Sequence, residues 1–426
     1  MIFMEYNVDL HIHGPHAGGT SKNMSVEKTA EMGYYKGLQL NPIGDLTHKG
    51  WFDRVFSSLK EEDECFYHET TTIFGKKKSY FILSTEVQVK GRVHNLVLFP
   101  DKKSILDFRE QIKPFTNHLD GVRDGRPWLQ FNSEKFAKIC VDLNLLFGPA
   151  HAFTPYFSLY GHNDSIKDTY GQYADDIAFL ELGLSADAYS ANDIEELKDI
   201  TFVSNGDAHS FWPHKLGREF NRFKLEKPNF YELEKAFKNK DGRELIFNVG
   251  LDPKEGQYTL TACNRCYQHY KLNYAIANNY RCSCGGTIKR GVQDRIDELS
   301  FGKTRSYNRP QYKHVLPLLE IIAFVLKIKN PLSTVVQKIW WKYIERFDNE
   351  INVLLDVSEK ELEEFDSEMA KYIISYRNGW VVYRPGGGGQ YGTPFICLSE
   401  EERIQKQREV DETIYNFPPP KQKTLF

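Results

Sequence analysis

Short apolar runs alternate with amphipathic segments over the first 250 or so residues of the chain. The runs that predict buried strands are YNVDLHIH, KGLQL, YFILSTEV, HNLVLF, LLFGPAHAF, IAFLELGLS and ITFVSNGDAHS. The segments between them that predict helices are SVEKTAEMGYYK, NSEKFAKICVDLN and SANDIEELKDI, the last with Ser190 or Asn192 as its cap. This repetition of strand and helix predicts an α/β barrel with its active site at the carboxyl ends of the strands.

The pattern changes near residue 255. LDPKEGQYTLTACNRC opens a compact segment with four cysteines, and three predicted helices follow in VLPLLEIIAFVLKIKNP, LSTVVQKIWWKYIERF and SEKELEEFDSEMAKYIISYRNG. The third begins at a Ser358/Glu361 capping box and ends at Gly379. WVVYR predicts a strand, PGGGGQYG a loop, and FPPPKQKTLF a disordered end. We therefore expect a barrel over 1–254, a cysteine module over 255–300, a helical domain with a Gly-rich loop over 301–392 and a mostly flexible tail over 393–426.

Composition and charge narrow the class of protein. The longest apolar run, Val315 to Leu326, is shorter than the ~20 residues that span a bilayer, and it contains Glu320. MIFMEYNVDL has no basic stretch followed by an apolar one, so we expect no secretory signal, no membrane partner and a cytoplasmic location. The net charge is -3, yet residues 281–346 carry 13 Lys and Arg against 5 Asp and Glu. That local excess predicts attraction for a polyanion.

Histidines and carboxylates gather at the predicted strand ends. In Asp9-Leu-His11-Ile-His13, alternation along a strand puts both imidazoles on the same side. Later strand ends supply Asp45, His48, Glu86, His94, His151, Asp207 and His209. A single one of these histidines is more typical of a hydrogen-bonded core residue, but the set at successive strand ends predicts a metal centre. Neutral imidazoles with carboxylates suit Zn²⁺ or Mn²⁺, and a carboxylate such as Glu86 can bridge two ions.

The four clustered cysteines have the spacing of a metal site. Cys263-x2-Cys266 is followed after 15 residues by Cys282-x-Cys284, which is typical of a zinc ribbon and of closed tetrahedral coordination. We expect one structural Zn²⁺ there. Lys289 and Arg290 beside it are candidates for DNA phosphate contacts, with a solvated charged face as the alternative.

The chain resembles the polymerase and histidinol phosphatase (PHP) superfamily through DLHIH, GDLTH, Glu86, His151 and GDAHS. Within it, the resemblance to the endonuclease Q family is closer, and it is carried by TSKNM, HAFTPYFSLYG, ELGLSADAYSAN, GDAHSFWPHKLGREFN, the four cysteines, HVLPLLEII, VLLDVSEKEL and PGGGGQYG. The resemblance implies a distorted (βα) TIM-like PHP barrel, followed by a zinc ribbon and a mostly helical C-terminal domain. It also implies hydrolysis of a DNA phosphodiester 5′ of deaminated bases (uracil, hypoxanthine, xanthine) or abasic sites.

The same resemblance implies two or three Zn²⁺ (or Mn²⁺/Mg²⁺) ions in the barrel. His11, His13, Glu86 and Asp207 would hold one, Glu86, His94 and His151 a second, and Asp45 or His48 with His209 a third. Catalysis would depend above all on Asp207, His209 and Glu86. A metal cluster lowers the pKa of a bound water to ~7, so that no protein nucleophile is required. The sequence shows no GxSxG nucleophile motif.

Contacts with damaged DNA are expected from residues that flank the ligands. Tyr156 and Trp212 are candidate walls for a base taken out of the stack. Lys215 and Arg218 are candidates for backbone phosphate contacts, with surface ion pairing as the alternative. Near the end of the chain, Gln422, Leu425 and Phe426 resemble the start of a sliding-clamp-binding peptide, with chance similarity as the alternative.

Three functions fit these features to different degrees. We favour a DNA repair endonuclease. A PHP-type phosphatase acting on small phosphate esters has no need of the cysteine module, the basic helices and the further 170 or so residues. A DNA-binding scaffold without catalysis has no need of the complete ligand set.

Overall fold

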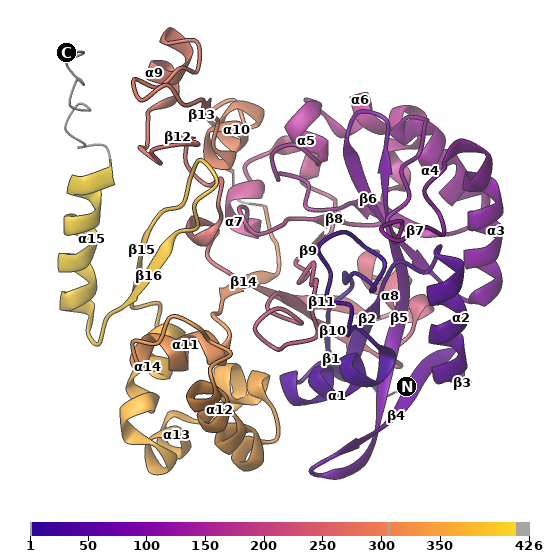
Figure 1. The fold of residues 1–426 in the computed structure, drawn as a ribbon, viewed down its shortest axis with the longest axis horizontal. Coiled ribbons are helices and arrows are strands. Elements are labelled where there is room, and N and C mark those ends of the chain that lie inside the picture. Colours follow the sequence, from indigo (N-terminus) through magenta and orange to yellow (C-terminus); the bar gives the residue numbers. More distant parts are fainter. Residues whose placement is uncertain (1, 306, 415–426) are drawn as a thin grey trace.

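A mixed sheet forms the centre of the molecule in the computed structural model, which describes residues 2–305 and 307–414 (Figure 1). Its strands are β1 (Met4–Val8), β2 (Leu40–Ile43), β3 (Lys60–Glu62), β4 (Cys65–Thr72), β5 (Gly75–Val89), β6 (Val93–Phe99), β7 (Leu146–Pro149), β10 (Phe220–Leu225), β11 (Glu244–Gly250) and β14 (Gln311–His314). They run in the order β14-β11-β10-β1-β2-β5-β4-β3, with β6 between β5 and β7. β2 is parallel to both β1 and β5, whereas β10 is antiparallel to β1.

The predicted mixed α/β class is confirmed, whereas a TIM-like barrel stays a prediction. β8 (Leu180–Glu181) and β9 (Phe202–Val203) form a parallel pair of their own. The Ala178 amide donates to the Phe147 carbonyl at 2.9 Å, and a bridge joins Ile12 to Ala208. These contacts place the β8–β9 pair between β7 and the end of β1, so that strand ends from most of residues 1–210 meet at one place.

Helices cover the sheet. They are α1 (Val26–Lys36), α2 (Lys49–Ser58), α3 (Lys102–Ile112), α4 (Ser133–Asp142), α5 (Leu159–His162), α6 (Ile166–Tyr170), α7 (Ala188–Ala191) and α8 (Phe230–Phe237). α1 and α4 confirm two predicted helices. Trp51 of α2, Phe81 of β5 and Phe136 of α4 are large buried side chains of one apolar core that joins these helices to the sheet. Every residue of β6 is buried, as expected of a strand covered on both faces.

The predicted helix over SANDIEELKDI is wrong in its start and length. α7 begins after Asp187, which forms a capping box with Ser190, and it stops at Ala191. A short 3₁₀ turn follows at Glu195–Leu197. The helix does not continue because Asn192 and Asp193 bind elsewhere: Asn192 accepts from Arg309 at 2.7 Å, and Asp193 accepts from the amide of residue 305 at 2.8 Å.

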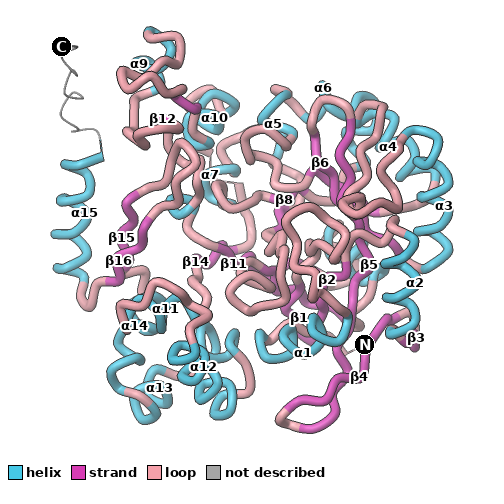
Figure 2. Tube along the Cα trace, in the orientation of Figure 1, coloured by secondary structure: helices cyan, strands magenta, loops and turns pink. Residues whose placement is uncertain are grey.

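The C-terminal part is mostly helical, as Figure 2 shows. The cysteine module contains β12 (Ala262–Cys263), α9 (Leu272–Ala277), β13 (Ile288–Lys289) and α10 (Val292–Leu299). The elements that follow are α11 (Leu318–Val325), α12 (Thr334–Phe347), α13 (Glu359–Phe365), α14 (Ser367–Arg377), β15 (Val381–Arg384), β16 (Thr393–Ile396) and α15 (Glu400–Ile414). No helix in residues 2–305 and 307–414 is both long and apolar enough to cross a membrane.

Two predictions for this part need correction. The Ser358/Glu361 capping box is confirmed, but the predicted helix divides at Asp366, which caps α14 by accepting from the Met369 amide at 3.1 Å. Residues 393–414, predicted as part of a mostly flexible tail, form β16 and α15, because β16 pairs with β15 and Val410 packs in a small apolar cluster. The clamp-like residues Gln422, Leu425 and Phe426 lie outside the described residues.

The Gly-rich loop fastens the C-terminal part to the cysteine module. The Leu260 amide donates to the Gly386 carbonyl at 3.1 Å, and the Gly389 amide donates to the Gln257 carbonyl at 3.0 Å. Gly388 has a φ of +66° and lies against the carbonyl of Cys263, where a side chain would collide. The glycines thus allow two backbone segments far apart in sequence to touch.

Candidate metal centre

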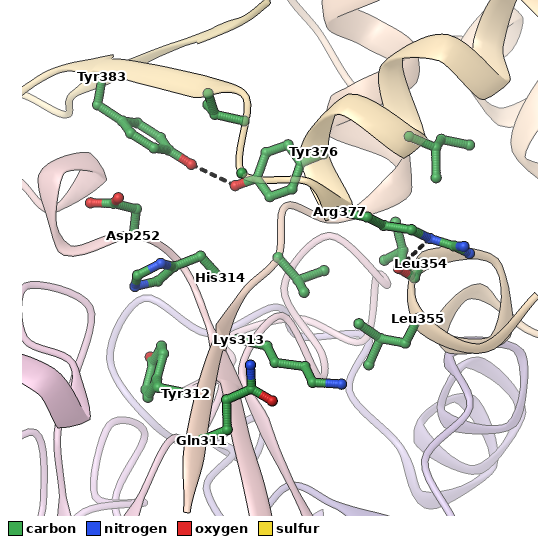
Figure 3. Close-up of a pocket in the computed structure, with 14 residues that line it drawn as sticks. Asp252, Gln311, Tyr312, Lys313, His314, Leu354, Leu355, Tyr376, Arg377 and Tyr383 are labelled. Carbon is green, nitrogen blue, oxygen red and sulfur yellow. Dashed lines mark hydrogen bonds between the residues drawn. The ribbon is translucent and has the colours of Figure 1, made fainter. Parts of the chain in front are cut away.

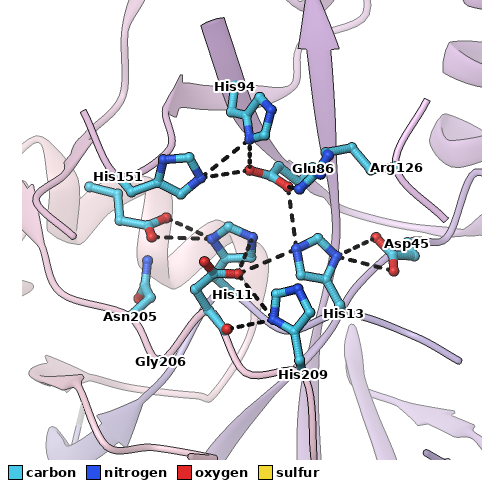
Figure 4. A network of polar contacts seen from close by, with 12 residues as sticks. His11, His13, Asp45, Glu86, His94, Arg126, His151, Asn205, Gly206 and His209 are labelled. Atoms are coloured by element: carbon cyan, nitrogen blue, oxygen red, sulfur yellow. Dashed lines mark hydrogen bonds and ion pairs between the residues drawn. The ribbon is translucent and has the colours of Figure 1, made fainter. Parts of the chain in front are cut away.

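One set of candidate ligands joins the residues after β1 to those after β9. His11 Nε2 and His13 Nε2 lie 3.7 and 3.3 Å from Asp207 Oδ1 (Figure 4). These three atoms are buried without a hydrogen-bond partner. Because buried polar atoms are normally paired, three such atoms within 4.8 Å of one another fit a cation.

Carboxylates hold the far side of both imidazoles. His11 Nδ1 lies 3.0 Å from Glu181 Oε2, and His13 Nδ1 lies 3.1 Å from Asp45 Oδ1. An Nδ1–H that donates to a carboxylate leaves Nε2 unprotonated and aimed at the shared position. Asp45, predicted as a ligand of a third ion, therefore stands behind His13, where it also accepts from the Gly14 amide at 2.7 Å.

Glu181 was not among the site residues predicted from the sequence. Its side chain is fully buried in β8. One sequence feature could have indicated it: Glu181 is a single charged residue inside the apolar run IAFLELGLS. Buried glutamates are rare unless they are paired, so such a residue suggests a partner.

The second set is Glu86, His94 and His151. Glu86 Oε1 lies 2.8 Å from His94 Nδ1 and 2.9 Å from His151 Nε2, and the two imidazole nitrogens are 3.3 Å apart. Gln88 accepts from His94 Nε2 at 3.0 Å, which leaves Nδ1 as the free nitrogen. The other oxygen of Glu86 lies 3.3 Å from His13 Nε2. One carboxylate thus faces both sets, as expected of a bridging ligand.

The electrostatics of the site favour anionic carboxylates and a cation between them. Burial alone would raise the pKa of Glu86, but the charge of Arg126 and hydrogen bonds from His13 and His151 hold it well below its usual range. Burial lowers the pKa of His94 to about 4, so this imidazole is neutral and able to act as a ligand. Burial would also lower the pKa of His11, but Glu181 and Asp207 raise it to about 9. The carboxylates around His11 therefore favour positive charge at this position.

Asp45, His48 and His209, which were predicted for a third ion, are not among the groups of three or more candidate ligands that converge within residues 2–305 and 307–414. His48 caps α2, and its ring stacks on that of His16 with centroids 3.8 Å apart. His209 donates from Nδ1 to the Asp207 carbonyl at 3.0 Å. The binding of a third ion by Asp45, His48 or His209 stays a prediction.

The four predicted cysteines converge in the module. The sulfurs of Cys263 and Cys284 are 3.5 Å apart, those of Cys266 and Cys282 are 3.6 Å apart, and all four lie within 4.8 Å of one another. Burial would raise the pKa of Cys282, but a hydrogen bond from Tyr270 lowers it to about 6. Four sulfur ligands at these distances fit a closed metal site.

A pocket of about 290 Å³ adjoins the second ligand set. Its lining includes His94, Arg126, His151, Phe157, Tyr258 and Tyr391. Tyr156 packs edge-on against Tyr258 with ring centroids 5.7 Å apart, and Lys289 Nζ lies 5.2 Å from the ring of Tyr156. Tyr156 and Lys289 therefore lie next to the pocket, where DNA contacts were predicted.

Three of the other predicted DNA contacts, Trp212, Arg218 and Arg290, have partners inside the molecule. Trp212 packs against the apolar core that the C-terminal helices share with the sheet. Arg218 donates to the Gly206 carbonyl at 3.2 Å, and Arg290 forms an ion pair with Glu298. Lys215 is half-buried, and burial lowers its pKa.

The predicted basic excess is also partly used within the molecule. Arg295 donates to the Tyr160 carbonyl at 2.9 Å and to the Asn163 carbonyl at 2.8 Å, and Arg309 donates to the Ile200 carbonyl at 2.7 Å. These arginines fix α10 and the segment after it to the N-terminal part.

The fold and these ligand sets define an α/β protein with candidate metal sites where its strand ends meet. Its chain resembles proteins of known structure over most of its length. It aligns with PfuEndoQ, a lesion-specific endonuclease from Pyrococcus furiosus, at a TM-score of 0.86 and 41% identity, over 94% of this chain and 97% of that one. A complex of Endonuclease Q with a 27-mer duplex carrying an abasic lesion at the active site matches at a TM-score of 0.85 and 41% identity, over 93% and 98%. The chain belongs to the endonuclease Q family.

Sequence relatives agree with this placement. The uncharacterized protein MJ0043 of Methanocaldococcus jannaschii is 43% identical over 249 residues, which are 57% of this chain and 31% of MJ0043. The uncharacterized protein YqxK of Bacillus subtilis is 30% identical over 331 residues, which are 76% of this chain and 79% of YqxK. The family model of the MJ0043 C-terminal domain matches residues 317–380. The chain thus spans about a third of the length of one of these relatives and most of the other.

Proposed function

We propose that this protein is a metal-dependent DNA endonuclease that hydrolyses the phosphodiester bond 5′ of a deaminated base or an abasic site. The observation that carries the proposal is the position of Glu86 between two converging ligand sets, beside a pocket, in a chain of the endonuclease Q family. The solved relative with an abasic duplex supports damaged DNA as the substrate.

The residues of the site divide into ligands and groups that position them. His11, His13 and Asp207 would hold one ion, and His94 with His151 a second, with Glu86 shared by both. Bound ions supply an activated water and neutralise phosphate charge. Glu181 and Asp45 behind the imidazoles would accept the Nδ1 protons and so orient the Nε2 ligand nitrogens toward an ion.

The pocket offers the means to hold a base out of the stack. Phe157, Tyr258 and Tyr391 supply apolar walls. Trp212, the other predicted wall, is partly buried against the apolar core of the C-terminal helices. Asn205 also lines the pocket, and its Nδ2 is a buried donor without a hydrogen-bond partner. Uracil, hypoxanthine and xanthine share a carbonyl where an exocyclic amine was lost, and a side-chain donor of this kind suits that carbonyl.

The N-terminal part as a PHP-type barrel over 1–254, and the cysteine module as a zinc ribbon over 255–300, belong to the same proposal. The convergence of four cysteines between two short strands supports the ribbon. The contacts of β8 and β9 with their neighbours support the barrel.

Labelled duplexes with a single uracil, hypoxanthine, xanthine or abasic site, and an undamaged duplex, test the proposal. The protein with Mn²⁺, Mg²⁺ or Zn²⁺ should cut 5′ of each lesion and spare the undamaged duplex. Asp207→Asn should abolish cutting and retain DNA binding, whereas Asp175→Asn, at an exposed position, should behave as the unmodified protein. Hydrolysis of small phosphate esters without cutting of any duplex would contradict the proposal and favour a phosphatase.

A further inference from the structure

Arg126 brings a positive charge into the candidate metal centre from a loop outside the strands. Its Nη1 donates to Glu86 Oε2 at 2.6 Å (Figure 4). Its side chain is 35% exposed, while that of Glu86 is completely buried. Arg126 also lines the pocket beside His94 and His151, and among the described residues of that lining it is the one lysine or arginine. The guanidinium therefore reaches both the shared carboxylate and the space next to the ligands.

The backbone on both sides of Arg126 is fixed. The Gln88 amide donates to the Pro127 carbonyl at 2.9 Å, which ties the loop to the end of β5. On the other side, Gly125 packs so closely on the metal centre that a Cβ there would come within 2.7 Å of Asp45 Oδ2. Arg126 is thus presented from a preorganised backbone, which a group that stabilises a transition state requires.

We propose that Arg126 is a catalytic residue that binds a non-bridging oxygen of the scissile phosphodiester, an inference that rests on the proposed endonuclease function. A guanidinium has five N–H donors in a planar fork, which suits phosphate oxygens. One of them holds Glu86, and the partly exposed remainder borders the pocket. Phosphate oxygens that approach ions held by Glu86 would therefore meet the guanidinium at the same place.

A purely structural role for Arg126, orienting Glu86, is the competing explanation. Glu86 is already held by His94 and His151 through one oxygen, and its other oxygen lies 3.3 Å from His13 Nε2. Loss of the arginine would then leave the carboxylate with its other partners. The two roles differ in what they predict for metal content and for substrates without a phosphate charge.

Steady-state cleavage of an abasic duplex by Arg126→Ala and Arg126→Lys is the first test. We expect kcat/KM to fall roughly 10²–10³-fold for Arg126→Ala and less for Arg126→Lys, with added guanidinium partly restoring the alanine variant. Metal content and melting temperature should stay unchanged. Arg123→Ala, at an exposed position of the same loop, is the matched control and should cut normally. Full activity of Arg126→Ala, or a loss of bound metal that accounts for its defect, would overturn the inference.

Binding measurements on two duplexes and two proteins test the contact between Arg126 and the scissile phosphate without relying on cleavage. The scissile linkage is replaced by a neutral methylphosphonate, and affinities are measured for the protein and for Arg126→Ala. The variant should bind the charged duplex at least several-fold more weakly than the unmodified protein, and the neutral duplex equally well. Equal losses on both duplexes would refute the contact. If the unmodified protein cuts none of the lesions, the proposed function is refuted instead. The same binding measurements would still show whether Arg126 contacts the phosphate.

Discussion

Removal of the charge on Glu181 should weaken the first metal position without changing its shape. Glu181 is fully buried, and its two oxygens lie 3.2 and 3.0 Å from His11 Nδ1. Glu181→Gln keeps the size of the side chain but replaces a charged acceptor with a neutral amide. A hydrogen bond to a charged group contributes about 1.5–3 kcal/mol, and carboxylates behind metal-bound histidines affect metal affinity by roughly 10–100-fold. We therefore expect metal affinity to fall by roughly one to two orders of magnitude.

The measurement is cleavage of an abasic duplex against buffered Mn²⁺ or Zn²⁺, together with competition against a chromophoric chelator. The half-saturating metal concentration should rise in proportion to the lost affinity, and saturating metal should restore most of the rate. Glu196→Gln is the matched control, because Glu196 accepts from the Tyr160 hydroxyl and the Ile166 amide outside both ligand sets. A metal requirement that is the same in Glu181→Gln as in the unmodified protein would refute the role of Glu181.

Three further outcomes are expected. Cys263→Ser/Cys266→Ser should contain about one equivalent of zinc less, and an unchanged zinc content would contradict a zinc site. Lys289→Ala should weaken binding to all DNA sequences and flatten the salt slope by about one, whereas Arg290→Ala should change it less because Glu298 neutralises that arginine; equal effects would contradict this reasoning. Burial raises the pKa of Glu219 from 4.5 to about 8, so the folded chain keeps a proton that the unfolded chain releases, and stability should fall as the pH rises between these values. Glu219→Gln should flatten that fall in melting temperature, and a pH profile identical to that of the unmodified protein would count against it.

Local sequence patterns predicted the candidate ligands that converge in the structure, but not the charged groups behind them. His11 and His13 follow a strand in which alternation alone sets their common direction. Glu181 and Arg126 gave no comparable signal, because one is a lone charge in an apolar run and the other lies in a polar loop. The positions of Glu181 and Arg126 beside the ligands depend on which strand ends meet in space. Strand pairing across nearly the whole N-terminal part decides this.

The surroundings of Trp212 and of the predicted tail could not be read from the local sequence. Trp212 stands close to a ligand in sequence, but the apolar core that it contacts includes helices more than a hundred residues later in the chain. In α15, Val410 is the one buried side chain, so the helix has no apolar face that would predict it from the sequence. Its packing against the β15–β16 hairpin is seen only in the structure. In both cases the packing partner cannot be read from the pattern of the segment itself.

The contact between the Gly-rich loop and the cysteine module sets an order of events during synthesis. The module's last cysteine, Cys284, precedes Gly386 by about a hundred residues, which a ribosome adds in roughly 5–20 s. Until then the nascent module lacks the backbone partner of Leu260, and the pocket lacks the wall that Tyr391 supplies. A nascent chain therefore contains all of its candidate metal ligands well before it can form the complete pocket.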